Sequence, residues 1–207
     1  MSAHRRDEYL QAARLAIDPG GVELELDLTP GIAVAEAIIA GIDRNRDGVL
    51  SQDEQRDHAG SVVSALALEV DGTPVQAQLT TFSFPDVAVM RLGEGIIRLQ
   101  LSATFPRPSA GPHQLLFRNG HHPDGSVYLA NALVPASDSV VVTAQRRDPY
   151  QTELTIDYVL RVGPATATDA WLLGSIAGAM VVVLGIRRSR SIGVKKAWRP
   201  YPPEDLP

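Results

Sequence analysis

The chain has no cysteine among its 207 residues. This absence excludes disulfide bonds, thiolate metal sites and a cysteine nucleophile. Aromatic residues make up only 5% of the chain. The Gly-x-Ser-x-Gly elbow, the phosphate-binding loop and the dinucleotide fingerprint are also missing. We find no set of residues arranged for catalysis elsewhere in the sequence. We therefore expect the chain not to be an enzyme.

The net charge of −5 is unevenly distributed. From residue 187 onward, six Lys and Arg residues stand against two acids, so this tail carries +4. Subtracting the tail from the total leaves −9 for the remaining residues. An acidic body does not favour binding to nucleic acid.

One stretch lacks charge altogether: AWLLGSIAGAMVVVLGI, residues 170–186. At a rise of about 1.5 Å per residue, it spans roughly 25 Å as a helix, the short end of a membrane span. Trp171 borders it on one side and RRSR on the other, as interfacial aromatic and basic residues do. We therefore expect a transmembrane helix at 170–186, a stalk at 163–169 and a basic tail at 187–207. A buried core helix is the alternative.

The basic flank predicts the side of the membrane on which each part lies. Basic residues next to a span usually stay in the cytoplasm, so we expect a single-pass protein of the cell membrane with an extracytoplasmic body and a cytoplasmic C-terminus. Residues 1–17 contain no apolar stretch long enough for a signal core. Export therefore requires a leader that this sequence does not contain. Tail anchoring, with the body in the cytoplasm, is the alternative.

Most of residues 1–162 alternate apolar and polar side chains over short segments separated by turn formers. This pattern predicts a mainly β fold, specifically an antiparallel β-sandwich. DPGG at 18–21 predicts one hairpin, and Asp71-Gly72 predicts another between strands at 65–70 and 75–84. A parallel α/β fold is not expected, because helices do not alternate with the strands.

An exception is the segment 30–68, where the apolar spacing becomes helical. The apolar residues with this spacing are Val34, Ile38 and Ile42 before a polar loop, and Ala59, Val62, Val63 and Leu66 after it. We expect two amphipathic helices inserted among the strands, with the loop DRNRDGVLSQDE (43–54) joining them.

This loop contains oxygen donors at alternating positions. Positions 1, 3, 5, 7, 9 and 12 are Asp43, Asn45, Asp47, Val49, Ser51 and Glu54. Val49 offers its backbone carbonyl, and Gly48 occupies position 6, where the chain turns sharply. Leu50 suits an apolar contact beneath the loop. Ser51 and Glu54 have the spacing of a capping box that begins the second helix.

The twelve residues fit the D-x-[DN]-x-[DN]-G-x₅-E pattern at every specified position, so the segment resembles an EF-hand. The resemblance implies Ca²⁺ as the bound ion and these six residues as its ligands. Only one such loop is present, and Arg44 and Arg46 lie within it, so we expect weak to moderate affinity. Outside the cell the ion is then structural. A solvated acidic turn, or a loop of this type that no longer binds, remain as alternatives.

More broadly, DEYLQA (7–12), ELDLTPG (25–31) and VYLANALVP (127–135) resemble uncharacterised bacterial membrane-anchored proteins with one EF-hand in a β-rich exported region. The sequence thus predicts a calcium-binding, membrane-anchored binding or scaffold protein, with a membrane-protein partner. The resemblance also implies an alternative, an accessory protein of a nickel/cobalt-type transporter. His113, His121 and His122 are then its candidate transition-metal ligands, whereas we expect His58 to be solvated.

Overall fold

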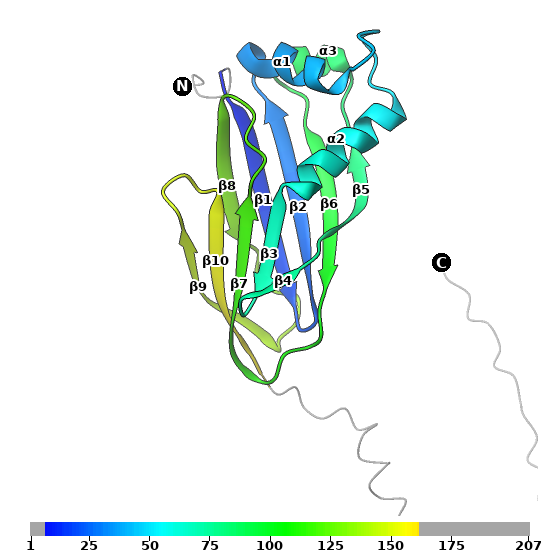
Figure 1. The fold of residues 1–207 in the computed structure, drawn as a ribbon. Helices are drawn as coiled ribbons and strands as arrows, with labels where there is room; N and C mark the ends of the chain where they lie inside the picture. The colour runs from blue at the N-terminus through cyan, green and yellow to red at the C-terminus, as the bar shows by residue number, and fades with distance from the viewer. Residues whose placement is uncertain (1–6, 162–207) are drawn as a thin grey trace, which may run out of the picture. The chain divides into compact units, whose positions relative to one another are not determined.

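Residues 7–161 are the part that the computed structural model describes, and they form two facing β-sheets with helices at one end and one flank (Figure 1). The strands are β1 (Tyr9–Asp18), β2 (Gly21–Pro30), β3 (Leu66–Val70), β4 (Thr73–Val75), β5 (Gln78–Ser83), β6 (Ile97–Thr104), β7 (Gly111–Asn119), β8 (Ser126–Ala132), β9 (Val140–Arg147) and β10 (Glu153–Leu160). The helices are α1 (Ile32–Ile42), α2 (Gln52–Ser64) and α3 (Val87–Arg91). The mainly β prediction is confirmed.

The first sheet has the strand order β5-β6-β2-β1-β8 and the second β4-β3-β7-β10-β9. Every pair is antiparallel except β1 with β8, which run parallel. The wholly antiparallel prediction is therefore wrong at this pair. The two strands lie more than a hundred residues apart in the sequence. The alternation of apolar and polar side chains predicts a strand, but it does not predict which strand pairs with it.

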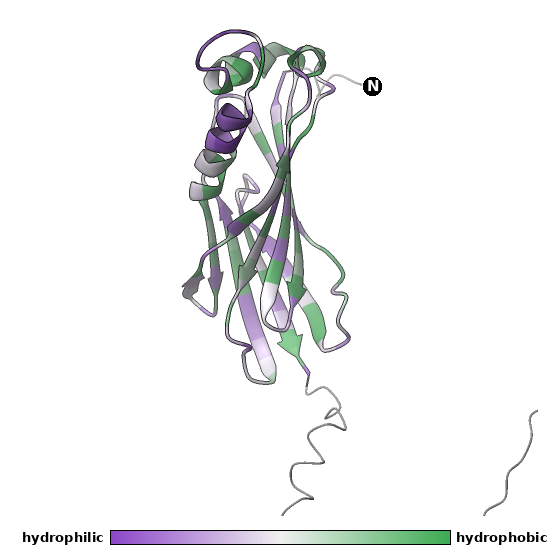
Figure 2. Ribbon diagram, turned by 90° about the vertical axis from the view of Figure 1, so that its right-hand side faces the viewer, coloured by the Kyte–Doolittle hydropathy of each residue, from purple (hydrophilic) through white to green (hydrophobic). Residues whose placement is uncertain are grey.

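Both sheets contribute to one hydrophobic core. On β1 and β2 every second residue is buried, because successive side chains of a strand point to opposite faces. Figure 2 shows this as alternating colour along the strands. The largest fully buried side chains include Tyr9, Phe117 and Tyr158, one from the first sheet and two from the second.

Both predicted hairpins form. Asp18 pairs with Gly21 at the β1–β2 turn. Val70 pairs with Thr73 across Asp71-Gly72, and both turn residues have positive φ. The strand predicted at 75–84 is divided, however. β4 pairs with β3 in the second sheet, whereas β5 pairs with β6 in the first, so the chain changes sheets at residues 76–77.

The helix pair predicted within 30–68 is present, with bounds slightly different from those expected. α1 lies across the ends of the strands at one end of the body, next to α3 (Figure 1). α2 contacts β3 and β5, one strand of each sheet, and so covers the flank between the sheets. Leu66, expected on the second helix, is instead the first residue of β3. We call the end with α1 and α3 the helical end.

Side chains of β9 cover the backbone of the edge strand β8. Arg147 Nε donates to the carbonyl of Ala130 at 2.7 Å, and Arg147 Nη2 donates to Asn131 Oδ1 at 2.6 Å. The N–H of Ala132 donates to Gln145 Oε1 at 3.0 Å. One carbonyl and one N–H of β8 therefore bond to side chains of β9 instead of another strand.

Within residues 7–161, none of the helices has the length and apolar character needed to cross a membrane. The stalk, transmembrane helix and basic tail expected at 163–169, 170–186 and 187–207 lie outside the described residues.

Candidate functional site: the loop between α1 and α2

The loop begins where α1 ends. Asp43 caps α1, and its N–H still donates to the carbonyl of Ile39 at 2.8 Å. The first candidate ligand is therefore fixed to the last turn of α1. Leu50 is 8% exposed and belongs to the hydrophobic core, which confirms the expected apolar contact beneath the loop.

The acidic and amide side chains of the loop accept hydrogen bonds from its own backbone. Asp43 Oδ1 accepts from the N–H of Asp47 at 3.2 Å, and Oδ2 accepts from that of Gly48 at 2.9 Å. Asn45 Oδ1 accepts from Asp47 N–H at 2.9 Å. Asp47 Oδ1 accepts from Val49 N–H at 2.8 Å. The carboxylates therefore point into the turn, where the backbone dipoles stabilise their charge.

Two residues with positive φ make this turn. Gly48 has φ of 81° and Arg46 has φ of 60°. Position 6 thus has the backbone conformation that the pattern requires of glycine. Nothing lies within 4 Å of a Cβ built on Gly48, so the backbone conformation, not space, favours glycine there.

Glu54 links the two ends of the loop. Its Oε2 accepts from the N–H and the Oγ of Ser51, at 2.9 and 2.7 Å, and its Oε1 accepts from the N–H of Arg44 at 2.9 Å. The predicted capping box is present in full. The hydrogen bond from the Ser51 hydroxyl, with further ones from backbone N–H groups, lowers the pKa of Glu54. Glu54 is thus a carboxylate at neutral pH.

Asp43 and Glu54, the first and last positions of the pattern, are 6% and 9% exposed. They are the only carboxylates among the buried polar side chains of residues 7–161. Neither is in an ion pair with Lys, Arg or His in the described part of the chain, since Arg44 pairs instead with Asp57 at the surface. A buried charge is costly unless an opposite charge or hydrogen bonds compensate for it. Here the backbone N–H groups of the loop and the Ser51 hydroxyl provide that compensation. The two carboxylates thus keep their negative charge without a cationic side chain, which suits a cation.

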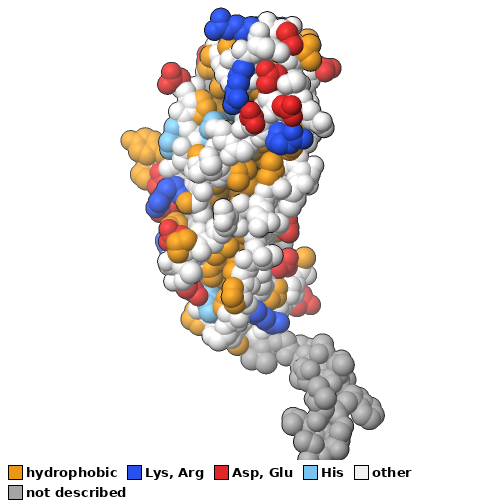
Figure 3. All heavy atoms as spheres, turned by 45° about the vertical axis from the view of Figure 1, so that its right-hand side comes forward, with side chains coloured by type: hydrophobic (Ala, Val, Ile, Leu, Met, Phe, Trp, Pro, Cys, Tyr) orange, Lys and Arg blue, Asp and Glu red, His pale blue; other side chains and the backbone are white. Residues whose placement is uncertain are grey.

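Arg44 therefore points away from the ligand positions. Its Nη1 lies 2.9 Å from Asp57 Oδ2 on α2, and both side chains are more than half exposed. Acidic and basic side chains accordingly lie close together over the helical end in Figure 3. A surface pair of this kind adds little stability, but it directs one of the loop's two positive charges outward.

The described residues contain no group of three or more His, Asp or Glu side chains arranged to hold a metal ion. In the loop, the Glu54 oxygens face backbone N–H groups, and Asn45 Nδ2 donates to Asp47 Oδ2 at 2.9 Å. Three of the six pattern positions are Asn45, Ser51 and the carbonyl of Val49, which are not acidic side chains and so do not count toward such a group. The oxygen donors fit a hard cation in kind and number. For Glu54 to bind a cation, its carboxylate must give up hydrogen bonds to the N–H groups of Arg44 and Ser51.

The structure separates the three histidines proposed as transition-metal ligands. His113 lies near the start of β7, whereas His121 and His122 follow its end, so about eight residues of strand, roughly 25 Å, separate them. His122 Nδ1 contacts the hydroxyl of Tyr128, which donates to the carbonyl of His121 at 3.0 Å. A three-histidine site is therefore not assembled in the described structure.

His113 contacts hydrogen-bond acceptors at both ring nitrogens. Nδ1 lies 2.7 Å from Asp71 Oδ2, and Nε2 lies 2.7 Å from the carbonyl oxygen of Ser109. Since both partners accept, the two contacts favour the imidazolium form, in which both nitrogens donate. Burial alone would lower the pKa of His113, but the hydrogen bonds to Asp71 and Ser109 and the charge of Asp71 together raise it. No lone pair is left for a metal ion.

We expect this ion pair to make stability fall as pH rises. A histidine with a raised pKa stabilises the folded state fully below its unfolded pKa of about 6.5, and this contribution is lost as pH rises through the folded pKa. The free energy of urea unfolding of the wild type, minus that of His113→Gln, should fall between about pH 6 and 9, because the difference cancels the opposite contribution of His58 and His121. Asp71→Asn, which suits the positive φ of that turn, should reduce the slope. Equal slopes in wild type and His113→Gln would contradict the assignment.

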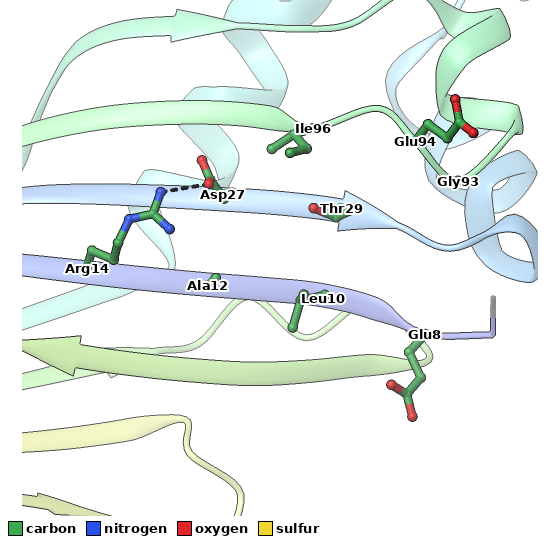
Figure 4. A pocket seen from close by; sticks show the side chains of 9 residues that line it. All are labelled: Glu8, Leu10, Ala12, Arg14, Asp27, Thr29, Gly93, Glu94 and Ile96. Carbon is green, nitrogen blue, oxygen red and sulfur yellow. Dashed lines mark hydrogen bonds and ion pairs between the residues drawn. The ribbon is translucent and has the colours of Figure 1, made fainter. Parts of the chain in front are cut away.

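A cavity of about 600 Å³ lies on the outer face of the first sheet, beside the loop that follows α3 (Figure 4). Leu10, Ala12 and Ile96 give it apolar walls. Arg14 Nη2 lies 2.7 Å from Asp27 and 2.8 Å from Glu25, so two carboxylates neutralise its charge. The cavity therefore offers no free cation to an anionic ligand.

Sequence reasoning did not identify this cavity or the environment of His58. His58 was expected to be solvated, but its Nε2 is buried and its ring lies against those of Phe84 and His121. Its position one helical turn after Glu54 is the only local signal that it shares the inward face of α2. Comparison of the chain with protein-family models, with curated proteins and with solved structures found no match.

Proposed function

We propose that the chain is a calcium-binding, membrane-anchored scaffold protein in which one EF-hand-like loop holds the ion. Asp43, Asn45, Asp47, Ser51 and Glu54 supply side-chain oxygens, and Val49 supplies its carbonyl. The observation that carries the proposal is the pair of buried carboxylates, Asp43 and Glu54, which have no cationic side chain as partner in residues 7–161. Ca²⁺ would supply an opposite charge, which the hydrogen bonds of the loop do not.

The position of the loop indicates what the ion would control. The loop joins α1, which covers the helical end, to α2, which covers the flank between the sheets. Glu54 lies in the first turn of α2 and Asp43 caps α1. An ion held by both residues fixes the angle between the helices, and with it the surface that they present beside the sheets. A membrane-protein partner would bind there, with residues 170–186 as the anchor and the body extracytoplasmic.

Calorimetric titration of the chelator-treated, full-length chain in detergent tests the proposal. We expect one equivalent of Ca²⁺ to bind with an affinity between micromolar and millimolar, as such loops do. Mg²⁺ should bind more weakly, because a flexible loop of oxygen donors with a bidentate carboxylate suits the larger ion. If no calcium bound at a Ca²⁺ concentration of about 10 mM, above the range of such loops, the proposal would be refuted.

A further inference from the structure

Three aromatic rings from distant parts of the sequence meet beneath α2. The rings of His58, on α2, and His121, in the β7–β8 connection, have centroids 5.9 Å apart and planes at 82°. The ring of Tyr9, on β1, lies 6.2 Å from that of His121. Phe84 packs against the other side of His58 at 5.9 Å. Two imidazoles and a phenol thus gather in a largely apolar setting.

Each of these rings carries a buried polar atom without a hydrogen-bond partner: His58 Nε2, His121 Nε2 and Tyr9 Oη. Only five side-chain atoms in the described part of the chain are in this condition, and three of them belong to this cluster. A buried polar atom without a partner costs about 1–3 kcal/mol. Their concentration at one place makes this cluster a candidate binding site.

The backbone that carries His121 is held rigidly. Its N–H donates to Asn119 Oδ1 at 2.9 Å, and its carbonyl accepts from Gln11 Nε2 at 3.0 Å. Asn119 Nδ2 in turn donates to Gln11 Oε1 at 2.8 Å, and both amides are buried. The polar groups around His121 are therefore satisfied while its ring nitrogen is not, as expected of a side chain positioned for a ligand.

Burial disfavours the charged form of both imidazoles. Burial, followed by the nearby charge of His121, lowers the pKa of His58 to about 4. Burial, followed by the charge of His122, lowers the pKa of His121. A neutral imidazole has one nitrogen lone pair, which is the form that binds metal ions.

We propose that His58 and His121 hold one transition-metal ion through their Nε2 atoms, with the Tyr9 hydroxyl beside it as a third donor. With metal–nitrogen bonds of about 2.0–2.1 Å, two imidazoles that share an ion have centroids roughly 5.2 Å apart at a tetrahedral angle and roughly 6.4 Å apart when they lie on opposite sides of the ion. The observed 5.9 Å lies between these distances, so binding in tetrahedral geometry requires the two rings to approach by a few tenths of an ångström. Imidazole nitrogen selects Zn²⁺, Ni²⁺ or Cu²⁺ over Ca²⁺ and Mg²⁺. The site is separate from the calcium loop and does not depend on it.

An ion at this place would attach α2 to the β7–β8 connection. Gly120 brings the two together, since its N–H donates to the carbonyl of Ala65, just after α2, at 2.8 Å. Glu54 and His58 are four residues apart on α2 and so lie on the same face of the helix. The two ions would therefore fix α2 at its first turn and one turn further along.

Calorimetric titration of the full-length chain with Zn²⁺ in detergent tests this site. Saturating Ca²⁺ is present, and His4→Ala serves as the background because His4 is the one histidine outside the described residues. We expect one equivalent of Zn²⁺ to bind. His58→Phe and His121→Phe should each weaken binding at least tenfold, whereas His113→Gln and His122→Phe should not.

Melting temperatures without zinc separate loss of the site from loss of the fold. Because phenylalanine keeps a ring and removes the unpartnered nitrogen, His58→Phe and His121→Phe should melt no lower than the background chain. With zinc, only the background chain should gain stability. No zinc binding, or binding that survives both phenylalanine substitutions, would overturn the proposal, as would loss of binding in His122→Phe.

Discussion

Glu54→Gln is expected to abolish the calcium-dependent rise in melting temperature of the full-length chain, while lowering the calcium-free melting temperature only slightly. At one hundred times the dissociation constant, an ion that binds only the folded chain adds about 2.7 kcal/mol. For a body of this size, this corresponds to roughly 5–10 °C in the wild type. Glutamine retains an acceptor oxygen for the capping box, but it lacks the charge and the second oxygen with which a carboxylate chelates Ca²⁺.

Glu54→Ala separates the two roles of this side chain. It removes the hydrogen bonds to Ser51 and Arg44 as well as the charge, so it should lower the melting temperature even in chelator. Glu36→Gln is the matched control, because Glu36 is an exposed carboxylate on α1 that pairs with Arg91 outside the loop, and this variant should retain the full calcium effect. An undiminished calcium shift in Glu54→Gln, measured by thermal unfolding with and without chelator, would rule out the ligand assignment.

Gly120→Ala is expected to destabilise the chain by about 1–3 kcal/mol, the usual cost of overpacking, and to lower the melting temperature by several degrees. A Cβ at this position would lie 2.6 Å from the carbonyl oxygen of Ala65. The backbone must therefore move, and the hydrogen bond between Gly120 and Ala65 weakens. The β7–β8 connection would then withdraw from α2.

Gly60→Ala is the control for this substitution. Gly60 lies within α2 and nothing lies within 4 Å of a Cβ built there, so alanine should stabilise the helix by roughly 0.5–1 kcal/mol. Urea unfolding of the two variants should therefore give changes of opposite sign. A Gly120→Ala variant as stable as the wild type would show that this close approach is not needed for the fold.

Local patterns in the sequence were sufficient for the parts of the fold that form between neighbouring residues. The β1–β2 hairpin, the turn at Asp71-Gly72 and the capping box of Ser51 and Glu54 each depend on a few adjacent residues whose conformational preferences agree with the structure. The ligand pattern of the loop is equally local. Its turn at Gly48 therefore follows from the sequence.

Pairings between distant segments could not be predicted in this way. The parallel pairing of β1 with β8 and the division between β4 and β5 depend on which strand edges meet. The alternation of apolar and polar side chains does not predict which edges these are. His58 shows the same limit at the level of a site. It follows Arg56 and Asp57, which are exposed, whereas the rings that lie against it, Phe84 and His121, come from distant segments.

The side chains that cover β8 have a consequence for crowded conditions. Arg147 and Gln145 bond to the carbonyl of Ala130 and the N–H of Ala132, near the end of this edge strand of the first sheet. A second molecule would have to displace a guanidinium and an amide before it could add a strand there. Addition of a strand from a second copy at this end of β8 is therefore opposed, which lowers the tendency of crowded copies to aggregate through it.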